Sequence, residues 1–255
     1  MFINTVIVLL RDMLPIFILF SYLSVLLTNK SSVKAVGFVL GVALGTLLYL
    51  LAESISDMFG GRGSELVKTG LAILGYGCFV RFSVARGFSS KSLYFDLAVV
   101  VGVLCVVSSQ FSSFLVYLFS QVNGSGNVVT LSTASVIGLG IAMSFSYLYR
   151  FLLQALVRHG NTWLVVMCWS LFLSGLLSQV YFHLAQVDMV TIGLKRLELG
   201  SWASESSVVG YLFKATIGFE LSPVIGQFIL YFLAACLLVG LRGFSPVPKV
   251  SEGVH

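Results

Sequence analysis

Long apolar runs separated by short polar breaks make up almost the whole chain. The runs are continuous rather than alternating, which is typical of helices in lipid and not of barrel strands. A helix needs about 20 mainly apolar residues to cross a hydrocarbon core of ~30 Å. The pattern therefore predicts an all-α integral membrane protein with one transmembrane domain over residues 1–255. Its seven spans cover about 2–28, 34–55, 66–84, 93–121, 131–157, 163–187 and 222–241.

The composition agrees with this class of protein. Hydrophobic residues make up 58% of the chain and charged residues 10%, and the mean hydropathy is +1.00. The first run begins at Phe2 with no basic residue before it, so we expect a permanent span and not a cleaved signal peptide. The four cysteines fall in separate runs without paired spacing, which favours a packing role over a disulfide or thiolate metal site.

The lysines and arginines gather at alternate breaks, and basic residues beside short loops stay on the cytoplasmic side. This asymmetry predicts a multi-pass protein of the inner (plasma) membrane with the N-terminus outside and the C-terminus inside. The same asymmetry accounts for the net charge of +5. We therefore expect the lipid bilayer, and no nucleic acid, as a partner. The basic residues concerned are Lys30, Lys34, Arg81, Arg86, Lys91, Arg158, Arg242 and Lys249.

The break over 188–221 is too long for a simple turn. Its latter half, SESSVVGYLFKATIGFELSP, mixes apolar residues with Lys214 and Glu220. This mixture predicts either a half-helix that enters the outer leaflet or an amphipathic helix that lies on it, and the pattern leaves both open.

Arg11 and Asp12 interrupt the first span about nine residues after its start. At 1.5 Å per residue they lie roughly 14 Å into the membrane, near its midplane. Each costs about 2.5–3.5 kcal/mol there when it has no partner. Neighbouring side chains on a helix point about 100° apart, so we expect the two to need partners on other helices or a water-filled cavity, instead of cancelling each other.

Pro15 has no amide hydrogen to donate to the carbonyl of Arg11, so a bend and a free carbonyl oxygen are expected beside Asp12. A carboxylate and a free carbonyl in mid-membrane are typical of cation or proton sites in transporters with broken helices. A structural ion pair of Arg11 or Asp12 with a neighbouring helix explains the same residues, and both interpretations stay open.

The fourth span carries a matching interruption, VVSSQFSSFLVYLF, with Ser109, Gln110 and Ser113 at its centre. Serines four residues apart share one helical face and can line a pathway, although serine stripes also serve helix packing. Span one and span four run in opposite directions, which predicts a 3+3 inverted repeat plus one helix. The polar face of span four should then meet Asp12 across a shared cavity.

Other polar groups are weaker candidates. Glu53, near the outer end of span two, is a second candidate metal ligand. His183 could ligate a metal together with Asp188, although a lone histidine is more often a hydrogen-bonded interface residue. Arg150 can extend to the membrane surface. Protease, phosphate-loop, zinc and redox motifs are not found in the sequence, so we expect no enzyme and no cofactor.

The order of spans and the residues VIVLLRDMLPIFILFSYL resemble the oxidase-coupled iron permease family of fungi and bacteria. That family carries Arg-Glu-x-x-Glu in span one and again in span four. In the first copy Arg11 matches the arginine, Asp12 stands at the first acid and Pro15 at the second. The motifs of this chain are degenerate, because Ser109, Gln110 and Ser113 replace all three charged positions of the second copy. From Gly218, GFELSPVIGQFILYFLAACLLVGL resembles the closing segment of the family, with Gln227 where an acid is frequent.

The resemblance implies an inner-membrane permease that takes up a metal cation, iron first, through a polar site between spans one and four. It assigns Asp12 as the ion ligand and a periplasmic iron-binding protein or an oxidase as partner. Hard iron ions prefer carboxylate oxygens, and the expected four acids have fallen to one. The alternative hypothesis is therefore a membrane subunit that keeps the permease fold, transports nothing and binds a partner protein.

Overall fold

The fold is taken from a computed structural model, which describes residues 2–27, 30–58, 60–84, 93–124, 127–190, 208–219 and 223–242. Within these ranges the structure is helical and contains no strand. The helices are α1 (Phe2–Leu26), α2 (Ser31–Leu50), α3 (Ala52–Met58), α4 (Gly63–Val84), α5 (Leu93–Asn123), α6 (Val128–Arg158), α7 (Thr162–Gln186), α8 (Val208–Ile217) and α9 (Ile225–Arg242).

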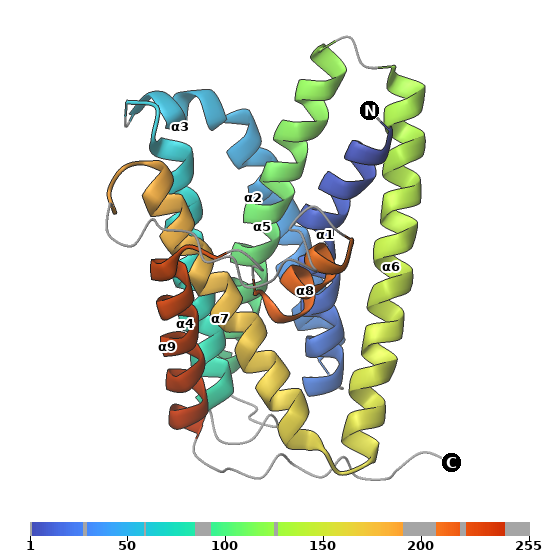
Figure 1. The fold of residues 1–255 in the computed structure, drawn as a ribbon, viewed down its shortest axis with the longest axis vertical. Helices are drawn as coiled ribbons and strands as arrows, with labels where there is room; N and C mark the ends of the chain where they lie inside the picture. The colour runs from blue at the N-terminus through green and yellow to red at the C-terminus, as the bar shows by residue number, and fades with distance from the viewer. Residues whose placement is uncertain are drawn as a thin grey trace.

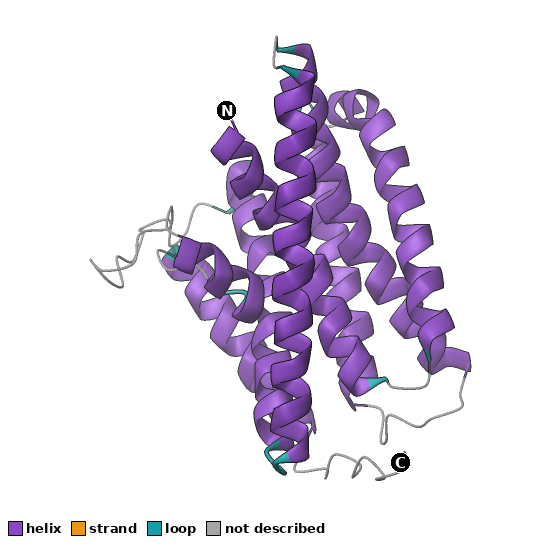
Figure 2. Ribbon diagram, turned by 90° about the vertical axis from the view of Figure 1, so that its right-hand side faces the viewer, coloured by secondary structure: helices purple, strands orange, loops and turns teal. Residues whose placement is uncertain are grey.

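Six of the described helices, α1, α2, α4, α5, α6 and α7, are long and apolar enough to cross a membrane. They stand roughly side by side, and successive long helices run in opposite directions (Figures 1 and 2). The predicted last span corresponds to α9, which is also apolar but has only 18 residues. A helix of that length rises about 27 Å.

The predicted second span, 34–55, is wrong at its outer end. Helix α2 ends at Leu50, and the short helix α3 begins at Ala52 and lies across the end of the bundle (Figure 1). The sequence AESISDM of α3 is polar and none of its residues is buried, so the chain leaves the apolar environment there. We call this end of the bundle the α3 end.

Small residues allow two close helix pairings. On α2 the buried glycines Gly37, Gly41 and Gly45 face α5, and a Cβ added at Gly41 would lie 2.7 Å from the Cβ of Val107. On α6, three small buried residues recur at the same spacing, Ala134, Gly138 and Ala142, and a Cβ added at Gly138 would lie 3.0 Å from Leu9 of α1. Close approach through small residues is typical of helices that pack in membranes.

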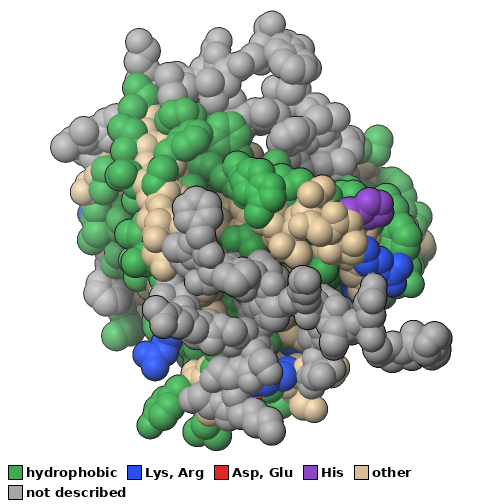
Figure 3. Space-filling view, turned by 90° about the horizontal axis from the view of Figure 1, so that it is seen from below, with side chains coloured by type: hydrophobic (Ala, Val, Ile, Leu, Met, Phe, Trp, Pro, Cys, Tyr) green, Lys and Arg blue, Asp and Glu red, His purple; other side chains and the backbone are tan. Residues whose placement is uncertain are grey.

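Charged side chains differ between the two ends of the bundle. Near the α3 end the described residues include four acids and two bases, which are Glu53, Asp57, Glu65, Asp188, Arg62 and Lys68. Near the opposite end, where lysine and arginine side chains reach the surface in Figure 3, they include one acid and six bases, which are Asp96, Lys30, Lys34, Arg81, Arg150, Arg158 and Arg242. Arg86, Lys91 and Lys249 lie outside the described residues.

Aromatic rings fill the core between the middle of the bundle and this basic end. Trp169 of α7 lies at the centre, with its indole N–H donating to Ser83 Oγ at 3.0 Å and its ring 5.3 Å from that of Tyr22. We call Tyr22, Phe79, Phe82, Trp169 and Phe172 the aromatic cluster, and each is 2% exposed or less. The Tyr22 hydroxyl also shares a 2.5 Å hydrogen bond with that of Tyr149 on α6.

Helix α8 lies in the predicted outer segment 188–221, of which the structure describes only 188–190 and 208–219. It packs against α1 and α7, and Ala215 on it is 2% exposed. The half-helix and the surface helix both stay predictions. The backbone turns at Gly218, which has a φ of +73° and touches Gly175 of α7. Neither position leaves room for a side chain, so two glycines let the end of α8 meet α7 directly.

Candidate functional site

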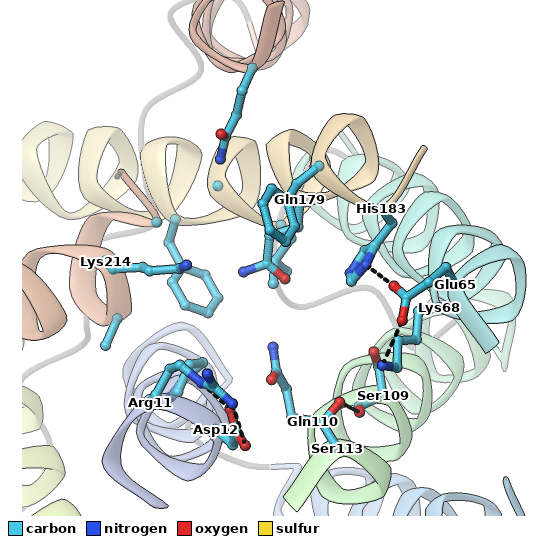
Figure 4. A pocket seen from close by; sticks show the side chains of 18 of the residues that line it. Arg11, Asp12, Glu65, Lys68, Ser109, Gln110, Ser113, Gln179, His183 and Lys214 are labelled. Atoms are coloured by element: carbon cyan, nitrogen blue, oxygen red, sulfur yellow. Dashed lines mark hydrogen bonds and ion pairs between the residues drawn. The ribbon is translucent and has the colours of Figure 1, made fainter. Parts of the chain in front are cut away.

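A polar cavity of about 330 Å³ lies between α1, α4, α5, α7, α8 and the start of α9 (Figure 4). Its charged and polar lining residues come from all six helices: Arg11, Asp12, Glu65, Lys68, Ser109, Gln110, Ser113, Gln179, His183, Gln186, Lys214 and Gln227. Glu65 and Lys68 lie in the first two turns of α4 and His183 in the last turn of α7. The cavity is therefore nearer the α3 end, and Phe172 separates it from the rest of the aromatic cluster.

Arg11 and Asp12 bind each other, contrary to the expectation from helix geometry. Arg11 Nε donates to Asp12 Oδ1 at 2.8 Å and Nη2 donates to Oδ2 at 3.3 Å. The long guanidinium side chain can bend across the angle between neighbouring positions, which the simple 100° argument ignores. The Asp12 side chain is 5% exposed and that of Arg11 is 49% exposed, so the acid is buried behind its base.

Pro15 lies within α1, one turn after Arg11, and also lines the cavity. Because proline has no amide hydrogen, the carbonyl of Arg11 lacks its usual helical donor. Helix α1 thus brings a carboxylate and its paired guanidinium to the cavity, one turn before a proline.

The interruption in α5 divides into two faces. Ser109, Gln110 and Ser113 line the cavity opposite Asp12, and Gln110 points toward its centre (Figure 4). Ser113 Oγ donates to the carbonyl of Ser109 at 3.2 Å. Ser108 and Ser112 are buried and do not line the cavity. The structure thus places the two interruptions predicted from sequence on one cavity.

Glu65 connects α4 with α7 at the side of the cavity. Its Oε1 accepts from Lys68 Nζ at 3.3 Å, and its Oε2 is bonded to His183 Nδ1. The weak candidate of a metal site shared by His183 and Asp188 is not formed in the structure, because His183 bonds Glu65 and Asp188 faces Arg62 at 3.8 Å. Both oxygens of Glu65 are therefore engaged by bases.

Sequence reasoning missed much of this lining. In the sequence, Glu65 and Lys68 are charges of opposite sign at the start of a span, and only the fold places them on one cavity with Arg11 and Asp12. On α7 a signal does exist, because Gln179, His183 and Gln186 recur at spacings of four and three and share one helical face. Lys214 points from α8 into the cavity (Figure 4).

The second candidate metal ligand lies elsewhere. Glu53 is exposed on α3 and does not line the cavity. In the described part of the chain, no three histidine, cysteine, aspartate or glutamate side chains form a group that could hold a metal ion. Of the cavity residues, Asp12 and Glu65 supply the carboxylates, and both are paired with bases.

Comparison of the chain with protein-family models, with curated proteins and with solved structures finds no match.

Proposed function

We propose that this protein is a multi-pass permease of the inner (plasma) membrane that moves a small polar solute through the cavity between α1 and α5. The observation that carries the proposal is the cavity itself, where polar side chains from six helices converge inside an apolar bundle. Such groups are costly at membrane depth and are usually tied to a solute or ion pathway. A cavity of this size also suits a small ligand.

The aromatic cluster gives the cavity a closed side. Phe172 lines the cavity, and its ring is 6.1 Å from that of Trp169, which is 1% exposed. In this proposal the aromatic cluster closes the cavity toward the basic end. Transport then requires the rings of the cluster to move apart. Alternating exposure of one central site to the two sides is the general logic of secondary transporters.

The proposed topology has seven spans, with α9 as the seventh, and an inverted repeat of α1, α2 and α4 with α5, α6 and α7. Two features support the repeat. In such a repeat α1 corresponds to α5 and α2 to α6, so the pair α2–α5 corresponds to the pair α6–α1. These two pairs form the two most extensive helix contacts in the bundle. Both pairs also use small residues at the same four-residue spacing.

The proposed orientation places the basic end in the cytoplasm, following the rule that lysine and arginine stay inside. The N-terminal end of α1 then lies outside and the cavity lies in the outer half of the membrane. The charge difference between the two ends supports this orientation.

Two predictions come from the family resemblance alone. They are that the solute is iron and that the partner is a periplasmic iron-binding protein or an oxidase. The test of the first is the accumulation of iron and manganese in cells that express the chain or Asp12→Asn. Unchanged accumulation in the presence of membrane-inserted protein would rule out transport of these metals through Asp12.

The permease proposal itself is tested without knowing the solute. Ser113→Cys is introduced into a chain whose four native cysteines, Cys78, Cys105, Cys168 and Cys236, are replaced by alanine. A membrane-impermeant thiol reagent is then added to right-side-out and to inside-out vesicles. We expect modification from both sides, because a transported solute must reach the cavity from both.

Leu74→Cys is the matched control, since Leu74 is 56% exposed on the outer apolar surface of α4 and should be modified from neither side. Modification of Ser113→Cys from one side only, or from neither, would contradict the permease proposal. It would favour the alternative of a membrane subunit that keeps the fold and binds a partner without transport.

A further inference from the structure

The charged groups of the cavity lining already have partners. Lys214 forms an interaction of its own. The other charged groups pair within the lining, as Arg11 with Asp12 and as Glu65 with both Lys68 and His183. Each acid of the described lining is thus held by at least one base.

A charged solute would disturb these pairs. Both oxygens of Asp12 accept from Arg11, so a cation would have to displace the guanidinium and would then face it at short range. An anion would have to displace Asp12 from Arg11, or Glu65 from Lys68, in the same way. Either exchange leaves a charge without its partner inside an apolar bundle, which is costly. An uncharged solute leaves the pairs intact.

The amides of the lining differ from its charged groups. Within the part of the chain that the structure describes, the side chains of Gln110 on α5 and of Gln179 and Gln186 on α7 form no hydrogen bond. Gln110 and Gln179 point into the cavity from facing helices (Figure 4). Each amide has two N–H donors and an oxygen that accepts. The lining therefore offers several donors and acceptors that carry no net charge.

Polar groups at membrane depth are costly until a partner satisfies them. Water can satisfy these amides, and so can a solute that presents its own donors and acceptors. Phe172, Leu176 and Phe182 line the same space, so a solute there also meets apolar surface. A small carbon skeleton with hydroxyl or amide groups matches both kinds of surface.

We propose, resting on the permease function above, that the solute is a small uncharged molecule with hydroxyl or amide groups, bound by the side-chain amides of Gln110 and Gln179. The solute donates to the amide oxygens and accepts from the amide N–H groups. Gln186 lies seven residues after Gln179, which is about 10 Å along α7 toward the α3 end. It is exposed, so a solute that enters from that end meets Gln186 before Gln179.

The test is ligand-dependent thermal stability of the purified full chain in detergent. Ribose represents solutes with hydroxyl groups and uracil represents solutes with amide groups, while sodium phosphate and ferrous chloride represent the two signs of charge. Each probe is titrated separately, with the ionic strength held constant by sodium chloride. A ligand that binds the folded state raises the unfolding midpoint. We expect a rise with ribose or uracil, and the probe that acts tells hydroxyl from amide recognition.

Gln179→Ala should weaken the apparent affinity for the active probe by about three- to tenfold, because it removes one amide that binds the solute. The matched control is Gln154→Ala, which removes a glutamine of α6 that does not line the cavity. It should leave the affinity unchanged, and it also corrects for any general effect of the probe on stability. If Gln179→Ala does not fold, Gln110→Ala serves as the second variant with the same expected loss.

Three results would overturn the assignment of an uncharged solute. They are a larger rise with phosphate or ferrous chloride than with either uncharged probe, no rise with any probe, and equal affinity in the cavity variant and in Gln154→Ala. The titration reports binding in detergent and not movement across a membrane, so none of these results affects the two-sided labelling of Ser113→Cys. The permease proposal and the solute proposal can therefore fail independently of each other.

Discussion

The two halves of the bundle core, which are the outer half with the cavity and the inner half with the aromatic cluster in the orientation proposed above, use opposite chemistry on the same helices. Helix α1 carries Arg11 and Asp12 in the outer half and Tyr22 about 15 Å further along its axis. Helix α7 carries His183 on the cavity and Trp169 in the aromatic cluster. Because both halves share these helices, a shift of one helix changes the cavity and the cluster together.

The two halves are held together by different kinds of interaction. In the aromatic cluster, stability comes from many close contacts between buried rings, which are individually weak and collectively large. In the cavity, it comes from a few specific pairs, Arg11–Asp12 and Lys68–Glu65–His183, which are sensitive to the loss of a single partner. The inner half should therefore respond to lost volume and the outer half to lost charge balance.

The largest expected effect is that of Trp169→Ala. Removing this indole leaves a cavity among Tyr22, Phe79 and Phe82 and also removes the donor to Ser83. Comparable truncations cost about 3–5 kcal/mol of unfolding free energy, measured by denaturant unfolding in detergent.

Trp163→Ala is the control on the same helix, because Trp163 is 63% exposed and should change stability by about 0.5 kcal/mol or less. Equal losses in the two variants would show that the aromatic cluster has no special role in the inner half.

Asp12→Asn should cost less, about 1–3 kcal/mol, because it leaves the Arg11 guanidinium beside a neutral amide. The double variant Arg11→Met/Asp12→Leu removes both charges and should be less destabilised than Asp12→Asn, as for other buried pairs. A double variant that is less stable than the single one would contradict this account of the outer half. Asp96→Asn, whose carboxylate is 35% exposed in its pair with Lys30, is expected to cost about 0–1 kcal/mol.

Gly175→Ala tests the boundary between the two halves. The added Cβ would overlap the backbone of Gly218, and such overpacking costs about 1–3 kcal/mol. Gly70→Ala is the matched control, since nothing lies within 4 Å of its added Cβ. A loss of stability in Gly70→Ala of similar size would contradict the steric explanation.

The sequence predicts the helices well because continuous apolar runs have few other structures available in a membrane. It fails at residues 51–55, where the change from apolar to polar is gradual and the helix breaks at Leu51. It also predicts that Asp12 and the Ser109–Ser113 face share a cavity, since both interruptions lie near the middle of long spans.

What the sequence does not predict depends on side-chain reach and on packing between distant helices. The pairing of Arg11 with Asp12 requires the flexibility of a guanidinium side chain, which positions on a helical wheel do not describe. The pairing of Glu65 with His183 joins residues 118 positions apart. No local pattern around either residue indicates the other, so the charge balance of the cavity emerges only from the fold.

The smallest expected effect is that of Ser113→Ala in the outer half. Its hydroxyl donates to the carbonyl of Ser109 on its own helix, so its loss should change stability by about 0.5 kcal/mol or less. A loss of more than about 1 kcal/mol, measured by denaturant unfolding in detergent, would contradict this and would show that the hydroxyl stabilises more than its own helix.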